Sequence, residues 1–159
     1  MQTNLVPVTF DKRFTKKLRI AIVRTNYHAE LVDNLELLAQ KTLLDTGVKE
    51  KSIKTFVVPG SWEIPLLVKK VAERKKYDAI IAFGVLVKGE THHFDLIASE
   101  VASALMQLSI DYNIPVIFEV LAVYNVMHAQ TRTALNEYNK GIEAANAALQ
   151  MIYSLRSVT

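Results

Sequence analysis

Short runs of β-branched and other apolar residues alternate along the chain with longer stretches in which apolar residues recur every three or four positions. Short continuous apolar runs are typical of strands buried on both faces, whereas the longer period is typical of helices that bury one face. The runs predict strands at residues 18–25, 55–59, 77–87 and 114–122. The periodic stretches predict helices near residues 32–43, 64–72, 94–108, 127–135 and 142–152.

Strands that alternate with helices favour βαβ units and a parallel sheet, with right-handed crossovers that place helices on both faces. The predicted fold class is therefore a three-layer α/β/α sandwich around a four-stranded parallel sheet. Residues 5–10, which read LVPVTF, could add one more strand at an edge, either here or in another subunit's sheet. The 159 residues match one domain, so we expect a single domain over 1–159 with an N-terminal arm at 1–17.

The composition excludes several kinds of chemistry. The absence of cysteine excludes disulfides, thiolate metal sites and cysteine nucleophiles, and it is compatible with a reducing cytoplasm. The densest basic run, at residues 12–19, is expected to be a solvated segment rather than a contact with nucleic acid or a membrane surface. No stretch of about 18 apolar residues occurs, so no membrane-spanning segment is expected.

Ligands of such folds bind beyond the carboxyl ends of the parallel strands. A site is therefore expected in the loops that follow the predicted strands. These loops are residues 24–30, 58–65, 85–95 and 119–129.

The loop after the third strand has the features of an anion site. It reads Lys88, Gly89, Glu90 and Thr91, and then a helix begins near His92 or His93. Free N–H groups at a helix start, together with a glycine, a lysine and a hydroxyl, suit a phosphate. The alternative is a capped helix with a surface lysine. The spacings of Walker A and of G-x-G-x-x-G are absent, so no dinucleotide cofactor is expected.

The two adjacent histidines cannot both face one point, because successive side chains on a helix diverge by roughly 100°. A neutral imidazole can accept a proton and return it, so either ring could serve as a general acid/base. The residues alone do not say which one does so, and a structural role is the alternative for each. No metal site is expected, because the spacing of the histidines matches no ligand pattern. These histidines are His28, His92, His93 and His128.

The loop after the second strand turns sharply into a helix. Gly60 permits a close backbone approach, Ser61 is expected to be the N-cap, and Pro65 is tolerated in the first helical turn. Trp62, the only tryptophan, and Tyr27 from the first loop could form the walls of a pocket for a planar ligand. The alternatives are packing of Trp62 against a neighbouring helix and an exposed loop tyrosine.

The fourth loop adds further candidates. Phe118 and Glu119 are expected near the end of the fourth strand, and Arg132 follows in the short helix. Arginine is a natural second clamp on a phosphate, although a solvated surface arginine is the alternative. Lys140 is expected to begin the last helix, with the same ambiguity.

Taken together, these loops resemble those of the 6,7-dimethyl-8-ribityllumazine synthase family. The resemblance extends in order from about Leu18 to Met151, and its motifs are specific only in combination. They are VPGSWEIP, YDAIIAFGVLVKGETHHFD, IPVIFEVL and A-x-x-R followed by NKG. The resemblance implies a flavodoxin-like fold assembled into pentamers, with active sites between adjacent subunits. It also implies a cytoplasmic transferase that needs no metal or organic cofactor and condenses 5-amino-6-(ribitylamino)uracil with 3,4-dihydroxy-2-butanone 4-phosphate.

The same resemblance implies roles for single residues. His93, which stands immediately before the aromatic residue of T-x-H-F, would be the general acid/base. Glu90 and Thr91 would hold the phosphate, with Arg132 reaching from the subunit that completes the site. The pyrimidine and its ribityl chain would contact Tyr27, Ser61, Trp62, Glu63, the backbone of Val85, Leu86 and Val87, and Phe118 of the neighbouring subunit. The supporting residues would be Lys88, Gly89 and Lys140.

Some positions depart from the family's pattern. His28 stands where many members have Asn, and Glu119 stands where Gly is common. Further atypical residues are Ala122, Met127 and His128. Residues 132–141 lack the glycine pair of many shell-forming members, and residues 26–33 resemble the subgroup that forms decamers. We therefore expect a pentamer or decamer rather than a sixty-subunit shell.

Two other functions remain open at this point. A non-catalytic paralog that binds lumazine or riboflavin would use the same aromatic residues, although loss of His93 or Arg132 would then be expected, and neither is lost. An unrelated signalling module of flavodoxin-like fold would need acidic residues at the end of the first strand. That end reads Arg24, Thr25 and Asn26.

Overall fold

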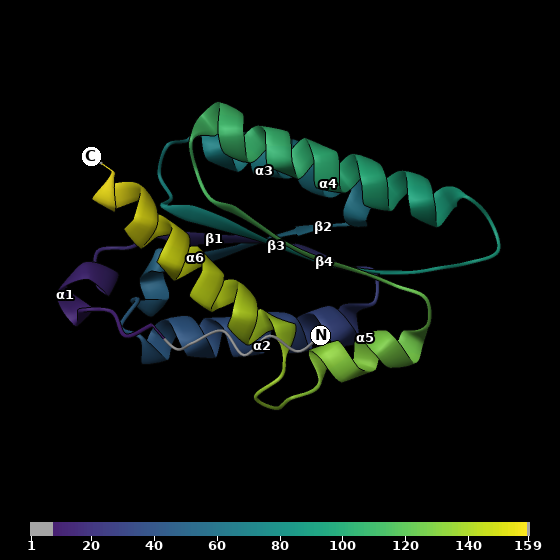
Figure 1. Ribbon diagram of the computed structural model, residues 1–159, viewed down its shortest axis with the longest axis horizontal. Coiled ribbons are helices and arrows are strands. Elements are labelled where there is room, and N and C mark those ends of the chain that lie inside the picture. Colours follow the sequence, from purple (N-terminus) through teal and green to yellow (C-terminus); the bar gives the residue numbers. More distant parts are fainter. Residues whose placement is uncertain (1–7, 159) are drawn as a thin grey trace.

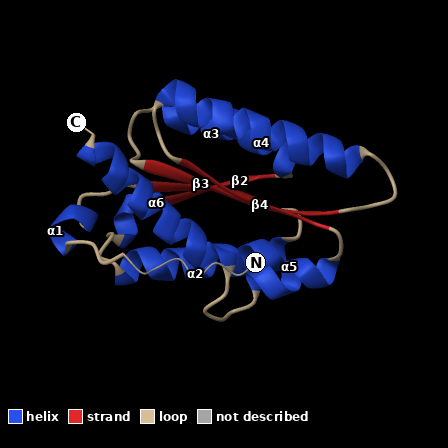
Figure 2. Cartoon of the chain, in the orientation of Figure 1, coloured by secondary structure: helices blue, strands red, loops and turns tan. Residues whose placement is uncertain are grey.

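Four parallel strands form one sheet between two layers of helices in the computed structural model, which describes residues 8–158 (Figures 1 and 2). The strand order is β2-β1-β3-β4. The strands are β1 (Ile20–Thr25), β2 (Ile53–Val58), β3 (Ala79–Val87) and β4 (Val116–Val123). The predicted three-layer α/β/α fold is confirmed, and the predicted strands start about two residues away from the observed ones.

The helices divide between the two faces of the sheet (Figure 1). One face carries α3 (Ile64–Glu73) and α4 (His93–Tyr112), and the other carries α2 (Ala29–Asp45), α5 (Val126–Thr133) and α6 (Lys140–Ser157). A one-turn helix, α1 (Lys12–Thr15), precedes β1. Two short 3-10 turns flank β2, namely η1 (Glu50–Ser52) and η2 (Ser61–Glu63).

Each strand contributes to two separate cores because successive side chains point to opposite faces. In β1, Ile20 and Ile22 belong to the core beneath α2 and α6, whereas Ala21 and Val23 belong to the core beneath α3 and α4. All of these side chains are fully buried. Burial on both faces explains why the strands read as continuous apolar runs in the sequence.

The N-terminal segment differs from the expected edge strand. Residues 5–7 of the predicted strand lie outside the described residues, and residues 8–10 form no strand. Phe10 and Phe14 stack with ring centroids 6.0 Å apart, and both rings contact Tyr153 of α6 edge-on. Aromatic packing therefore attaches this segment to the end of α6.

Helix α6 approaches α2 closely at Gly141. A Cβ atom at this position would lie 2.0 Å from the carbonyl oxygen of Leu35. Asn139 caps α6 through its side chain, which accepts a hydrogen bond from the Gly141 N–H. The helix therefore begins at Lys140 as predicted, in a place where only glycine fits against α2.

Candidate active site

The loops after β1 and β2 are joined by backbone hydrogen bonds at the carboxyl edge of the sheet. The Asn26 N–H donates to the Val58 carbonyl at 2.8 Å, and the Tyr27 N–H donates to the Pro59 carbonyl at 3.1 Å. The Thr25 hydroxyl donates to the Tyr27 carbonyl at 3.1 Å. These bonds fix the backbone of Tyr27 beside the loop that carries residues 60–63.

The loop after β2 is a closed turn seated on β3. The Gly60 N–H donates to the Glu63 carboxylate at 3.0 Å, and the Glu63 N–H returns a bond to the Gly60 carbonyl at 3.3 Å. Ser61 is buried, and a Cβ on Gly84 of β3 would lie 2.9 Å from its Oγ. The prediction that Ser61 is an N-cap is wrong, because Gly60 precedes η2 and Glu63 precedes α3. Pro65 does lie in the first turn of α3.

Two aromatic side chains project from these joined loops. Tyr27 is 67% exposed and Trp62 is 59% exposed, so neither belongs to the core. The Tyr27 ring meets the His28 ring edge-on at 4.6 Å, and His28 has a left-handed backbone with φ of 52°. Because both large rings are exposed, both are available to a planar ligand or a neighbouring subunit. The buried Ser61 hydroxyl belongs to the same pair of loops.

The loop after β3 is exposed from Lys88 through His93. It is anchored at one end, where the Lys88 N–H donates to the Val123 carbonyl of β4 at 2.8 Å. Its interior has weak contacts: the His93 N–H lies 3.4 Å from the Thr91 hydroxyl, and no atom lies within 4 Å of a Cβ built on Gly89. The backbone around Gly89 is therefore open to a ligand.

The end of β3 leads directly into this loop. Val85 is buried, whereas Leu86 and Val87 are partly buried at the last two positions of the strand. Their backbone pairs with β4 in register. The predicted backbone contacts to the pyrimidine therefore lie within the sheet, directly before Lys88.

The two histidines have different surroundings. Helix α4 begins at His93, one of the two predicted starts, and His92 is the residue before it. The His92 Nδ1 lies 4.0 Å from the Asp95 carboxylate, and the Lys88 amine lies 3.4 Å from the same carboxylate. Within residues 8–158, no hydrogen bond or ion pair involves the His93 ring. Of the two rings, that of His93 is the one without a protein partner.

Phe118 and Glu119 are the third and fourth residues of β4, opposite Ala82 and Phe83. The prediction that they lie near the strand's end is therefore wrong. Because β4 is an edge strand, Phe118 keeps 43% of its surface exposed.

The Glu119 carboxyl has an unusual environment for a strand residue. Burial raises its pKa to about 7, the charge of Glu143 acts in the same direction, and Lys140 opposes them. Lys140 itself forms an ion pair with Glu143 on α6. The sequence showed Glu119 only as an unusual residue, because its burial depends on how α6 packs over β4.

Arg132 is not brought to the anion loop within one chain. It lies in the last turn of α5 and donates to the His128 carbonyl of its own helix at 3.1 Å. Helix α5 starts at the carboxyl end of β4 and runs away from the loop after β3 (Figure 1). The described residues contain no hydrogen bond or ion pair between Arg132 and residues 88–93.

No three histidine or acidic side chains within residues 8–158 are placed to hold a metal ion. The helices in that range include none with the length and hydropathy needed to cross a membrane.

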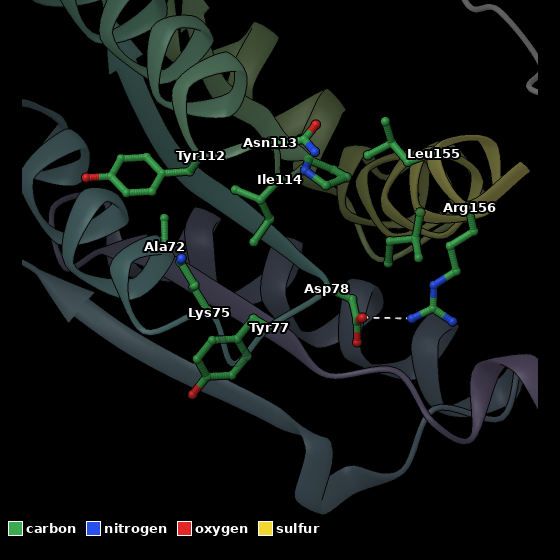
Figure 3. A pocket seen from close by; sticks show the side chains of 11 residues that line it. Ala72, Lys75, Tyr77, Asp78, Tyr112, Asn113, Ile114, Leu155 and Arg156 are labelled. Atoms are coloured by element: carbon green, nitrogen blue, oxygen red, sulfur yellow. Dashed lines mark hydrogen bonds and ion pairs between the residues drawn. The ribbon is translucent and has the colours of Figure 1, made fainter. Parts of the chain in front are cut away.

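A pocket of about 280 Å³ lies at the opposite, amino edge of the sheet (Figure 3). The Asp78–Arg156 ion pair, 2.8 Å long, closes one side of it, and Lys75 and Tyr77 lie on the other. The C-terminal ends of α3, α4 and α6 converge there. Helix C-termini present carbonyl groups and partial negative charge, whereas the start of α4 presents backbone N–H groups.

Comparison with known proteins gives one consistent result. A sequence model of the family described as 6,7-dimethyl-8-ribityllumazine synthase matches residues 17–156. A synthase of that name from Acidovorax sp. (strain JS42) is 35% identical over 151 residues, which cover 95% of this chain and 96% of the relative. Another, from Chlamydia caviae, is 40% identical over 137 residues, which cover 86% and 89%. A third, from Stenotrophomonas maltophilia (strain K279a), is 34% identical over 148 residues, covering 93% and 96%.

Proposed function

Because the chain belongs to the 6,7-dimethyl-8-ribityllumazine synthase family, we propose that the loops at the carboxyl edge of its sheet form the catalytic site of this synthase. The protein is a transferase of riboflavin biosynthesis. It condenses 5-amino-6-(ribitylamino)uracil with 3,4-dihydroxy-2-butanone 4-phosphate. The products are 6,7-dimethyl-8-ribityllumazine, phosphate and water.

The pyrimidine substrate binds to the joined loops after β1 and β2. Tyr27 stacks on or beside the ring, and Ser61, Trp62 and Glu63 contact the ring and the ribityl chain. Support comes from the hydrogen bonds that tie Tyr27 to Pro59, and from the exposure of both aromatic side chains. The backbone at the end of β3, Val85 to Val87, completes this half of the site.

The phosphate of the second substrate binds at the start of α4. Free N–H groups at a helix N-terminus and the Thr91 hydroxyl are suited to an anion. The Glu90 backbone adds a donor, and the open surroundings of Gly89 allow the phosphate to approach the loop closely. Lys88 contributes positive charge at the same place, although Asp95 shares its amine.

His93 moves protons between the two substrates. The pyrimidine's 5-amino group attacks the ketone and the adduct loses water to form an imine. Phosphate is then eliminated, and attack of the ribitylamino nitrogen on the remaining carbonyl closes the second ring with loss of a second water. Each stage needs a proton given or taken, and one imidazole that changes between acid and base can supply these transfers. The remaining rate acceleration comes from holding the two substrates in contact.

The site is completed by a neighbouring subunit in a homo-oligomer of pentamers, either a single pentamer or a decamer. Arg132 then clamps the phosphate of the adjacent chain, Phe118 covers the pyrimidine there, and Lys140 adds positive charge. Two observations support this arrangement. Arg132 donates to the His128 carbonyl of its own helix, which runs away from the loop after β3 (Figure 1), and Phe118 is exposed on an edge strand.

The observation that carries the catalytic assignment is the position of His93. Among the described residues, no hydrogen bond or ion pair involves its ring, and its backbone N–H, at the first position of α4, lies 3.4 Å from the Thr91 hydroxyl. The test is to mix purified protein with both substrates and follow the absorbance and fluorescence of the lumazine. Reactions that lack protein, or either substrate, are the controls. A protein that bound lumazine tightly but formed none would contradict the enzyme and favour the binding paralog.

A further inference from the structure

Arg24 is a buried cation at the carboxyl end of β1. Only 8% of its surface is exposed, and its side chain lies on the face of the sheet covered by α2. Its Nη1 donates to the carboxylates of both Asp33 and Glu36, the second at 3.0 Å, and Nε contacts the Thr25 carbonyl at 3.3 Å. Burial acts to lower the pKa of Arg24, but its hydrogen bonds to the two carboxylates, together with their negative charges, outweigh burial, and the net shift is upward.

Glu36 connects this cation to a third element. One of its oxygens accepts the bond from Arg24, and the other accepts bonds from the Thr55 hydroxyl of β2 and from the Gln40 amide at 2.8 Å. A single carboxylate therefore links β1, α2 and β2. Buried charges that lose a partner are costly, so these links oppose any displacement of α2 along the sheet.

The turn that carries Tyr27 lies between the two ends of this network. Arg24 holds the strand on one side of the turn, and Asp33 and Glu36 hold the first turns of α2 on the other. His28, between Tyr27 and α2, provides no side-chain cap and has a left-handed backbone. The bonds from Asn26 and Tyr27 to the loop after β2 would transmit a shift of α2 to residues 59–63.

We propose that Arg24, through Glu36, is a positioning residue for the pyrimidine substrate: it holds α2 and the Tyr27 turn at the distance that the ring requires. Arg24 does not itself touch the substrate. The inference rests on the proposed role of Tyr27 in pyrimidine binding. It predicts that the pyrimidine half of the site, and not the phosphate half, depends on this ion pair.

The test uses the full-length protein with Arg24→Met, Arg24→Lys and the double variant Arg24→Met/Glu36→Met. Arg19→Met is the matched control, because Arg19 is an exposed arginine immediately before the start of β1. For each protein the measurements are kcat, the KM of each substrate, thermal unfolding, and binding of the pyrimidine alone. Binding is followed through fluorescence of Trp62, the only tryptophan.

Arg24→Met is expected to weaken pyrimidine binding and raise the pyrimidine KM about 10-fold or more, while the KM of the butanone phosphate changes less than about 3-fold. Arg24→Lys, which keeps the charge but not the forked donor, should fall between wild type and Arg24→Met. The double variant also removes Glu36, the more buried of the two carboxylates that lose their cation, and should regain thermal stability while its pyrimidine KM stays high. Equal changes in both KM values, or recovery of the KM together with stability, would overturn the inference.

One comparison separates this inference from the proposed site. If Tyr27→Ala leaves pyrimidine binding unchanged, the assignment of the pyrimidine site fails. If Tyr27→Ala weakens that binding at least 10-fold but Arg24→Met leaves it unchanged, the site stands and the role of Arg24 is wrong.

Discussion

The loops after β2 and β3 belong to one proposed site but are built differently. The loop at residues 59–63 is closed by bonds between Gly60 and Glu63, tied to the loop after β1, and seated on β3 through buried Ser61. The loop at residues 88–92 is exposed along its whole length. Its interior has one contact between backbone and hydroxyl, at 3.4 Å.

The difference indicates which half of the site one chain can form by itself and which half depends on a neighbouring subunit. A ligand that meets an ordered surface loses less affinity to conformational ordering, so the pyrimidine half should be formed in the free subunit. The phosphate half has N–H donors, but within residues 8–158 Arg132 bonds to its own helix and makes no hydrogen bond or ion pair with residues 88–93. We therefore expect substitutions in the first half to act on pyrimidine affinity, and those in the second to act on turnover and phosphate affinity.

His93→Ala should have the largest effect. Loss of a general acid/base typically lowers turnover by about 10²- to 10⁴-fold, and the ordered pyrimidine loops should still bind their ligand nearly as well. Steady-state kinetics and Trp62 fluorescence measure the two quantities. His92→Ala is the matched control, because that neighbouring ring contacts Asp95 instead. A fully active His93→Ala protein would refute the catalytic assignment.

Arg132→Ala should act mainly on the butanone phosphate. Removing a hydrogen bond to a charged group costs about 1.5–3 kcal/mol, so the KM for this substrate should rise roughly 10- to 100-fold. Arg13→Ala, at an exposed position on α1, is the control. An unchanged KM for the phosphate would count against the clamp.

The same variant tests whether the site lies between subunits. Neither His93→Ala nor Arg132→Ala can form an intact site alone, but mixed oligomers of the two contain interfaces that pair a normal His93 with a normal Arg132. Co-assembly should therefore restore part of the activity. If the mixture is no more active than the two separate proteins, both residues act within one chain.

Gly84→Ala should disturb the ordered half without touching the other. Its added methyl would lie 2.9 Å from Ser61 Oγ, 3.2 Å from Val120 and 3.3 Å from Thr25, so the buried Ser61 side chain must move, either alone or with the loop after β2. Overpacking of this kind costs about 1–3 kcal/mol, and the pyrimidine KM should rise several-fold. Gly89→Ala is the contrasting variant, because nothing lies within 4 Å of a methyl there. Equal pyrimidine KM values for the two variants would remove the distinction between the loops.

Residue pattern predicted the layers of the fold well because burial on both faces leaves a continuous apolar run for each strand. It also placed the start of α4 at the paired histidines and the start of α6 at Lys140. It failed for Ser61, which is buried against Gly84 instead of capping a helix. That contact joins residues far apart in the sequence, and local pattern carries no information about it.

The Arg24 network was missed for a related reason. In the sequence, Arg24 indicated only that the first strand does not end in acidic residues. Its partners, Asp33 and Glu36, occupy ordinary polar positions of an amphipathic helix. Their convergence depends on the angle at which α2 crosses β1, which the apolar period does not specify.

Glu119→Gln should have the smallest effect and should act on stability rather than on either loop. In the folded protein the Glu119 pKa is about 7, compared with a usual value of 4.5. The folded state therefore holds a proton that the unfolded chain releases, and this contribution to stability is lost as pH rises from about 4.5 to about 7. Glutamine cannot ionise, so the variant should match wild type below pH 4.5 and exceed it above pH 7 by at most the roughly 3 kcal/mol that a pKa shift of this size represents. Thermal unfolding of both proteins across this range measures the difference. A difference that does not change with pH would mean that the Glu119 carboxyl already ionises near its usual value, and that α6 does not bury it against β4.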